Sequence, residues 1–284
     1  LSGRTVRQYS INPFGAIKYG FSRDAAGIER IGGSVEAAAA IKRQATQPGV
    51  NHVLMKDLAA IHQASILAEA QLAGALPDVE AAPYGPASLM DVQLLGAGKV
   101  RNGLAHQLRM VAGMIAAAPK LGLKRQVFFV TLPGFDTHSG QNRRHTELMM
   151  QLDHGLAYFD AVLQSLGVGN QVTTFTASDF GRTFTSNGDG TDHGWGSHQF
   201  VMGGAVKGGD IHGAFPLFAA KNTQNNDFPG SNDLLNGGVL LPKQSAVQMG
   251  ATLGRWFGLN GTQLADVFPT LGRFNSADLG FMKA

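Results

Sequence analysis

The segment Gln126-Val-Phe-Phe-Val-Thr-Leu132 carries no charge and is rich in β-branched and aromatic side chains. This composition is typical of a short strand that is buried on both faces of a sheet. A second run of this kind, Gln171-Val-Thr-Thr-Phe-Thr-Ala177, follows further along the chain. Between them, residues 143–166 repeat leucine and phenylalanine at intervals of three and four, which predicts an amphipathic helix. Strand, helix and strand together predict a right-handed parallel crossover.

The remaining elements are predicted from helical periodicity and from breaker residues. Helices are expected at residues 34–45, 55–76, 102–118 and 245–259, where apolar residues and good helix formers recur at helical spacing. Pro119 should end the third of these helices. Residues 199–202 predict one further strand. Residues 1–33 mix Gly, Pro and Ser and predict an extended, irregular lead-in.

The size of the chain allows one large domain or two small ones. Its 284 residues are 44% hydrophobic and 15% charged, which is ordinary for a globular protein with a sizeable core. We expect a mainly helical lead-in over residues 1–120 and an α/β metal-site part over residues 121–284, within one continuous domain. No stretch approaches the roughly 18 consecutive apolar residues of a transmembrane helix, so none is predicted.

Charge and cysteine content exclude several classes of function. The 23 basic and 20 acidic residues give a formal net charge of +3 and form no long run of like charge. A nucleic-acid partner is therefore not indicated. Because the chain has no cysteine, zinc–thiolate sites, disulfides and thiol nucleophiles are excluded. Any metal ion must be held by oxygen and imidazole ligands.

Acidic residues follow both predicted strands, at the edge of a parallel sheet where ligands usually bind. The first strand leads into Gly134-Phe-Asp-Thr-His-Ser139 and the second into Ser178-Asp-Phe-Gly-Arg-Thr183. Asp136 and His138 are two residues apart, so in extended backbone their side chains leave the same face and can meet one ion. Alternatively, Asp136 caps the following helix and His138 is an ordinary loop histidine.

A glycine-rich loop supplies the third group of candidate ligands. It reads Asn187-Gly-Asp-Gly-Thr-Asp-His-Gly-Trp-Gly-Ser-His198, and its small residues would let the backbone fold closely enough to bring ligands together. Its aspartates could instead stabilise turns. Six of the nine histidines lie between His138 and His212, which favours a site. The candidate metal ligands are therefore Asp136, His138, Asp179, Asp192, His193 and His198.

This set of ligands suits a divalent metal, best Zn or Mn, then Fe and, less well, Mg or Ca, and it is large enough for one or two ions. Two ions would clamp the attacking and leaving oxygens of an ester displacement. Arg182 is the candidate catalytic residue, because a guanidinium matches the geometry of a phosphate or sulfate. Equally, Arg182 could hold Asp179 or Asp192 in place.

Four motifs, in this order along the chain, resemble a known family. They are Gly134-Phe-Asp-Thr-His-Ser, Ser178-Asp-Phe-Gly-Arg-Thr, Gly190-Thr-Asp-His-Gly-Trp-Gly-Ser-His and Met202-Gly-Gly-Ala-Val-Lys-Gly-Gly. Together they resemble the bacterial domain-of-unknown-function 1501 family, which is similar to the alkaline phosphatase and sulfatase superfamily. The resemblance implies an α/β fold with a doubly wound, mostly parallel sheet and helices on both faces. It also implies twin-arginine export to the periplasm or the cell exterior, and metal-dependent hydrolysis of phosphate or sulfate esters, with a small anionic ester as substrate.

By this likeness Asp136 and His138 would serve one metal ion with His193 or His198, and Asp179 would serve a second. The chain departs from the superfamily at Phe180, where a histidine is usual. Nothing in residues 1–284 matches the family's opening strand with its glycine-rich, aspartate-bearing turn, so either that segment precedes residue 1 or the chain is a degenerate relative. The hydroxyl groups left as nucleophiles are those of Thr137, Ser139, Thr183 and Ser197. The alternative hypothesis is a non-catalytic exported binding or assembly protein that keeps the fold, with a protein partner or a second copy of the chain.

Overall fold

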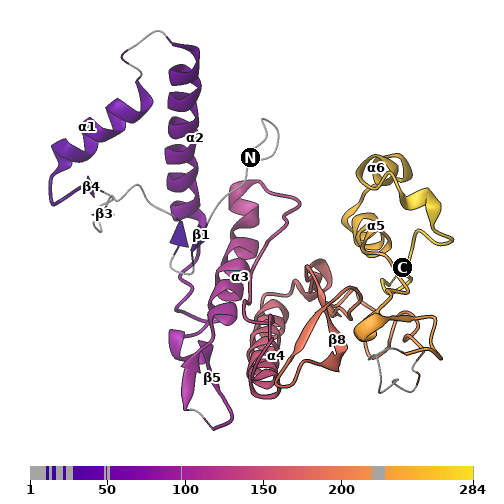
Figure 1. Cartoon of the computed structure of the whole chain (residues 1–284). Coiled ribbons are helices and arrows are strands. Elements are labelled where there is room, and N and C mark those ends of the chain that lie inside the picture. The colour runs from indigo at the N-terminus through magenta and orange to yellow at the C-terminus, as the bar shows by residue number, and fades with distance from the viewer. Residues whose placement is uncertain are drawn as a thin grey trace. The chain divides into compact units, whose positions relative to one another are not determined.

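The computed structural model describes residues 11–12, 15–16, 22–23, 28–47, 49, 52–96, 98–217, 219 and 228–283. It is a mixed α/β structure with six α-helices and several small antiparallel sheets in these residues (Figure 1). The chain divides into two compact units. The first unit contains residues 1–87 and 106–128, and the second contains residues 88–105 and 129–284.

The first unit is built around two helices that contact each other, α1 (Val35–Thr46) and α2 (Val53–Ala75). The Ser34 side chain caps α1 by accepting a hydrogen bond from the Ala37 N–H at 3.1 Å. Both predicted helices are confirmed. Two antiparallel pairs precede them, β1 (Ile11–Asn12) with β2 (Gly15–Ala16) and β3 (Ser22–Arg23) with β4 (Glu29–Arg30). Much of the predicted lead-in, including residues 1–10, lies outside the described residues.

Helix α3 (Gly103–Leu121) contributes to both units. In the first unit its buried Arg109 forms an ion pair with Glu80 at 2.9 Å. The helix was predicted to end at Pro119, but it continues to Leu121 with the proline in its last turn. A hydrogen bond from Leu123 N to Ala118 O, 2.9 Å long, closes the end of the helix beyond the proline.

In the second unit the start of α3 is joined to α4 (Gln141–Ser165) by one buried side chain. Asn102 accepts hydrogen bonds from Leu104 N and Ala105 N, which caps α3, and its Nδ2 donates to Gln151 O of α4 at 2.7 Å. The hairpin of β5 (Asp91–Gln93) and β6 (Lys99–Arg101) precedes this junction. Helix α4 confirms the long helix that was predicted over residues 143–166.

The predicted parallel crossover does not appear in the described residues, so the doubly wound parallel sheet is not confirmed. Residues 126–132 form no helix or paired strand, and Val127 and Phe129 are 81% and 90% exposed. The second predicted strand is reduced to β7 (Thr174–Phe175), which pairs antiparallel with β10 (Val201–Met202). A strand must satisfy its backbone N–H and C=O groups with a neighbour. All strand pairs in the described part of the chain are antiparallel, so no parallel neighbour stands beside residues 126–132.

A six-residue strand and its partner form the hairpin that is central to the second unit. Strand β8 (Gly181–Ser186) pairs antiparallel with β9 (Thr191–Gly194), and the register places Arg182 opposite His193. The short strands β11 (Leu234–Leu235) and β12 (Val239–Leu240) pair with each other, and β12 also contacts β8 and β9. A small core of Phe228, Leu234 and Leu240 lies in this region.

Two helices complete the second unit, α5 (Ala246–Phe257) and α6 (Gly261–Val267). Ser245 and Gln248 form a capping box at the start of α5, which confirms the helix predicted over residues 245–259. Short 3-10 helices lie at Ala87–Met90, Gly169–Gln171, Asn236–Gly238 and Leu271–Arg273. None of the helices in the described ranges combines the length and apolar content needed to cross a bilayer.

The segment after α6 is tied back to α5 by a carboxylate. Asp278 accepts a hydrogen bond from Gly280 N at 2.8 Å and from the Arg255 guanidinium at 2.8 Å. These contacts lower the pKa of Asp278, the Gly280 N–H first and the arginine second. The last residues are thereby fixed to the helix.

Candidate metal centre

Two segments that are distant in the sequence meet at the amino end of α4. The turn between β8 and β9 rests on the backbone of residues 137–141, with hydrogen bonds from Gln141 N to Asp189 O at 3.1 Å and from Gly140 N to the Asp189 carboxylate at 2.8 Å. Gly190 has no side chain to hold the segments apart, since a Cβ there would stand 2.3 Å from Thr137 O. The hairpin is therefore seated directly on the segment that carries Asp136 and His138.

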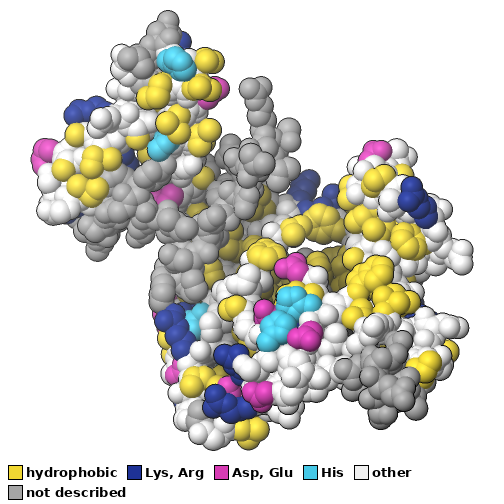
Figure 2. Space-filling view, in the orientation of Figure 1, with side chains coloured by type: hydrophobic (Ala, Val, Ile, Leu, Met, Phe, Trp, Pro, Cys, Tyr) yellow, Lys and Arg dark blue, Asp and Glu magenta, His cyan; other side chains and the backbone are white. Residues whose placement is uncertain are grey.

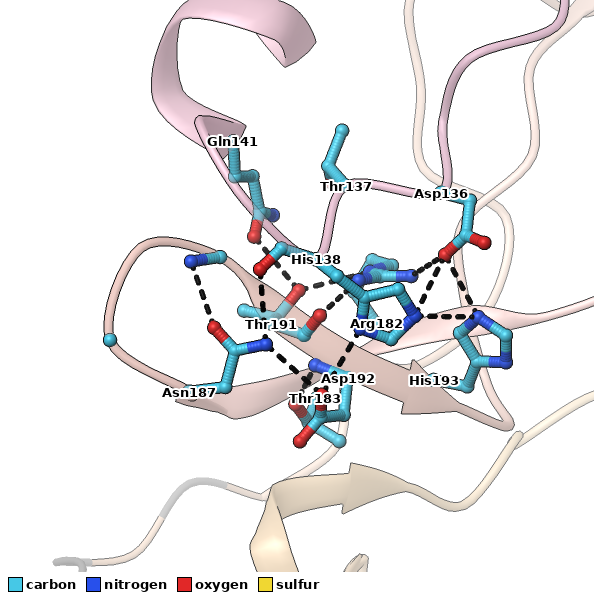
Figure 3. A network of polar contacts seen from close by, with 12 residues as sticks. Asp136, Thr137, His138, Gln141, Arg182, Thr183, Asn187, Thr191, Asp192 and His193 are labelled. Carbon is cyan, nitrogen blue, oxygen red and sulfur yellow. Dashed lines mark hydrogen bonds and ion pairs between the residues drawn. The ribbon is translucent and has the colours of Figure 1, made fainter.

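This seating brings Asp136, His138 and His193 together, with their side chains pointing toward one another (Figure 3). Asp136 Oδ1 lies 3.0 Å from His138 Nε2 and 2.9 Å from His193 Nε2. The two imidazole Nε2 atoms are 3.2 Å apart. One oxygen and two nitrogens thus form a nearly equilateral triangle.

The spacing of the three atoms is close to what a metal ion requires. With bonds of about 2.0–2.1 Å, two ligands of a tetrahedral ion lie about 3.3 Å apart, so outward movements of a few tenths of an ångström would fit one. Two imidazoles and one carboxylate are a ligand set used for zinc and for other first-row metals. The side chains of Asp136, His138 and His193 are 54%, 48% and 51% exposed, so solvent reaches the group. Figure 2 shows histidine and acidic side chains gathered at the surface.

Arg182 is anchored to the candidate ligands. Its Nη1 donates to Asp136 Oδ1 at 2.9 Å, its Nε donates to Thr191 Oγ1 at 3.0 Å, and its Nη2 donates to Thr191 O. The guanidinium carbon also lies 5.7 Å from the centre of the Phe180 ring. Of the two roles considered for Arg182, the structure therefore shows that of holding an aspartate, but the aspartate is Asp136 and not Asp179 or Asp192.

Asp192 lies beside the three ligand atoms and contacts the other nitrogen of one imidazole. Its Oδ1 is 3.1 Å from His138 Nδ1 and accepts a hydrogen bond from Asn187 Nδ2 at 3.1 Å. The Asp192 backbone N–H donates to Thr183 Oγ1 at 3.2 Å. No role in the site was predicted for Asn187 from the sequence. The only sequence feature that marks this residue is the Asn187-Gly188 pair, which is typical of turns.

Aromatic packing fixes the ring of His193. The Phe180 ring stacks on it at 4.1 Å between centroids with an interplanar angle of 16°, and the His138 ring lies 4.9 Å away. Phe180, the residue at which the chain departs from the phosphatase pattern, thus occupies one face of a candidate ligand.

Like Asp192, the predicted ligands Asp179 and His198 lie outside the group of three. In the part of the chain that the structure describes, the ligand atoms that could share one ion come from Asp136, His138 and His193, and neither Asp179 nor His198 joins them. The His198 ring instead lies 5.6 Å from the ring of Phe215.

Both aspartates near the imidazoles have pKa values below the ordinary range. For Asp136 the main cause is the hydrogen bond with His193, followed by that from Arg182. For Asp192 the main cause is the hydrogen bond from Asn187, followed by that from His138. Both carboxyl groups are therefore ionised at neutral pH, as metal ligands and their hydrogen-bond acceptors must be.

The hydroxyl groups considered as nucleophiles differ in solvent exposure and in hydrogen bonding. Thr137 is 1% exposed. The Thr183 hydroxyl donates to Thr185 O at 2.9 Å and accepts from Asp192 N, and Ser197 Oγ lies 3.5 Å from His198 O. Ser139 is exposed. The Thr137 side chain is thus shielded from solvent, and the Thr183 hydroxyl is already hydrogen-bonded within the β8–β9 hairpin.

The protein is thus a mixed α/β protein with a candidate metal centre. The β8–β9 hairpin contacts the start of α4 there, and two imidazoles and a carboxylate form an exposed cluster. Residues 42–268 match the family described as "Protein of unknown function (DUF1501)". Because this match covers most of the sequence, the chain belongs to that family. No curated protein and no solved structure matches the chain significantly.

Proposed function

We propose that this protein is a metal-dependent hydrolase of phosphate or sulfate esters, with one divalent ion held by Asp136, His138 and His193. The observation that carries the proposal is the triangle of Asp136 Oδ1, His138 Nε2 and His193 Nε2, with sides of 3.0, 2.9 and 3.2 Å. Zn and Mn are the ions that this ligand set favours.

The contacts of His138 leave one of its nitrogens facing the other two atoms. A carboxylate only accepts hydrogen bonds, so the contact with Asp192 is made by an N–H at Nδ1. Nε2 faces Asp136 Oδ1 at 3.0 Å and is placed to bind a cation together with that oxygen.

The exposure of the site favours catalysis over a purely structural role. Structural zinc sites are closed by four protein ligands, whereas catalytic sites use three and leave a position open. Here three ligand atoms are available and their side chains are about half exposed. When bound, the ion would supply Lewis-acid polarisation of an ester oxygen and neutralise the charge that develops on it.

The chain's own residues have defined tasks in this proposal. Asp136 and the two imidazoles bind the ion, while Arg182 fixes Asp136 through its Nη1. The stack of Phe180 on His193 holds that ring in position. Arg182 also brings positive charge next to the site, which favours an anionic ester as substrate.

Metal analysis and an ester panel test the proposal. The full chain, stripped with chelator and reloaded with Zn²⁺ or Mn²⁺, should bind about one ion per chain and hydrolyse nitrophenyl phosphate or nitrophenyl sulfate. His193→Ala should lose both properties, whereas His212→Ala, which replaces a partly exposed histidine of the same unit outside the cluster, should keep them. Wild-type protein that binds neither ion rules out the metal centre, and protein that binds an ion without hydrolysing either ester rules out this activity.

The non-catalytic alternative has one observation in its favour. Thr137 is buried and the Thr183 hydroxyl is hydrogen-bonded within the β8–β9 hairpin, so neither is available as a nucleophile. In that case the protein would be an exported binding or assembly protein in which the ion is structural. Metal binding with no hydrolysis in the ester panel, together with loss of thermal stability on metal removal, is the outcome that distinguishes this alternative.

The finer fold and the location are part of the same proposal. The resemblance to the alkaline phosphatase and sulfatase superfamily supports a doubly wound parallel sheet that includes residues 126–132. The exposure of Val127 and Phe129 also supports it, because two large apolar side chains gain about 1.5–3 kcal/mol each when they are covered. Slow amide exchange over residues 126–132 would support such pairing, and fast exchange would contradict it. Export to the periplasm or beyond rests on the resemblance alone, and fractionation of cells that make the complete protein tests it.

A further inference from the structure

We propose that Asp192 is not a metal ligand but the positioning residue of His138, and that Asn187 in turn holds Asp192. This inference rests on the proposed metal centre. It adds two residues that do not touch the ion, Asp192, which orients a ligand, and Asn187, which holds Asp192. Both residues lie on the β8–β9 hairpin segment, so the hairpin would supply His193 as a ligand and would also orient the ligand on the facing segment.

The first step of the argument concerns the two nitrogens of His138. Nε2 is part of the ligand triangle, 3.0 Å from Asp136 Oδ1 and 3.2 Å from His193 Nε2. Nδ1, on the other side of the ring, lies 3.1 Å from Asp192 Oδ1. One imidazole therefore bridges the triangle and the carboxylate of Asp192.

The second step concerns the proton. Since the carboxylate accepts, Nδ1 must donate, and Nε2 is then the nitrogen that is free to bind an ion. Metal-binding histidines commonly donate their second N–H to a carboxylate in this way, which selects the tautomer and fixes the ring orientation. Asp192 has the geometry of such a partner, because it contacts the nitrogen that is turned away from the triangle.

The third step concerns what holds Asp192. Asn187 Nδ2 donates to Asp192 Oδ1 at 3.1 Å and to His138 O at 3.2 Å, while Asn187 Oδ1 accepts from Gly190 N at 2.9 Å. One amide side chain thus joins the turn, the aspartate and the backbone of the histidine (Figure 3). The carboxylate is fixed relative to the ring that it orients.

The test compares Zn²⁺ and Mn²⁺ affinity, by chelator competition, in the full chain and in matched variants. Asp192→Ala should weaken binding about 10–100-fold, which is the usual effect of losing such a partner. Asp192→Asn should weaken it less, because the amide oxygen can still accept the Nδ1–H bond. Asn187→Asp keeps the acceptor for Gly190 N but removes the donor to Asp192, and should weaken binding by less than Asp192→Ala does. Asp153→Asn removes the same charge from an exposed position of α4 and should bind as the wild type does.

Two further measurements separate positioning from ligation. The Co²⁺-loaded forms of wild type and Asp192→Ala should have absorption bands of the same intensity and shape, since the ligands of the ion are unchanged. In the Zn²⁺-loaded wild type, the Nδ1-bound proton of His138 should appear as a downfield NMR signal, and it should shift upfield in Asp192→Ala.

The outcomes are distinct. Wild-type affinity in Asp192→Ala overturns the inference and leaves the metal centre standing, and a changed Co²⁺ coordination in that variant overturns it by making Asp192 a ligand. If Asp192→Ala does not fold, Asp192→Asn and Asn187→Asp decide, and wild-type affinity in both overturns the inference. If the wild type binds neither ion, the proposed centre itself fails and the inference fails with it.

Discussion

Replacing Gly190 with alanine should disturb the metal centre without changing any residue that contacts it. An added Cβ would lie 2.3 Å from Thr137 O, 2.5 Å from His138 C and 2.6 Å from His138 O. Non-bonded heavy atoms are at their best separation at about 3.5 Å, so the hairpin and the 137–138 backbone would have to separate by about 1 Å. All three atoms belong to backbone, which cannot turn aside as a flexible side chain can.

The same displacement has two measurable consequences. Overpacking of this kind costs about 1–3 kcal/mol of unfolding free energy, and at about 2–4 °C per kcal/mol the melting temperature should fall by about 2–12 °C. Because His138 and His193 lie on opposite sides of the contact, their 3.2 Å separation should grow by about the same 1 Å. Metal affinity should then fall about 100-fold, since a ligand displaced by this amount no longer reaches the ion.

Chelator competition and thermal unfolding in excess EDTA measure these two effects separately. Gly208→Ala is the matched control, because a Cβ at Gly208 would meet no atom within 4 Å. If Gly190→Ala melts together with this control and binds Zn²⁺ within about twofold of the wild type, the close seating of the hairpin is refuted.

His193→Ala should lower Zn²⁺ affinity at least about 100-fold relative to His212→Ala, because one of three ligands is lost; equal affinities measured by chelator competition would contradict this. Arg182→Met should raise the pKa of Asp136, because one of the hydrogen bonds that lower this pKa is removed. NMR titration of the Asp136 carboxyl carbon measures the change, and an unchanged pKa would show that the arginine does not lower it. Asp278→Asn should cost about 1 kcal/mol or less near pH 7, since this carboxylate is partly solvent-screened. Its lowered pKa means that the contribution is present above the unfolded value of about 3.9 and is lost as pH falls through the folded value, so the difference in stability between Asp278→Asn and wild type should disappear in denaturation curves near pH 2.

The sequence was sufficient to predict five of the six helices in the described residues and three candidate ligands whose side chains meet. Periodicity located α1, α2, α4 and α5 to within a few residues, because each has its own apolar pattern and most have capping side chains. The i, i+2 spacing of Asp136 and His138 correctly predicted that the two side chains would reach one place. The Asp-His pair at 192–193 was correctly associated with them, although Asp192 contacts an imidazole outside the triangle.

The predictions that the structure does not reproduce all depend on how the strands pair. The composition of residues 126–132 and 171–177 describes strands but says nothing about which neighbour satisfies their hydrogen bonds. Asp179 was chosen as a ligand because it follows a presumed parallel strand, yet β7 ends at Phe175 and pairs antiparallel with β10. The role of Asn187 could not be predicted either, since its partners depend on how the β8–β9 turn rests on the start of α4.

The distance along the chain between the two imidazoles has a consequence for folding. His138 and His193 are 55 residues apart in sequence, and the segment between them contains the whole of α4 and β8 and ends within β9. A bound ion would therefore act as a removable cross-link that closes one large loop of the chain. If a chelator removed the ion, this loop would open and gain conformational freedom although no covalent bond is broken. The rate of proteolytic cleavage near the hairpin turn would then report how much of the protein holds the metal.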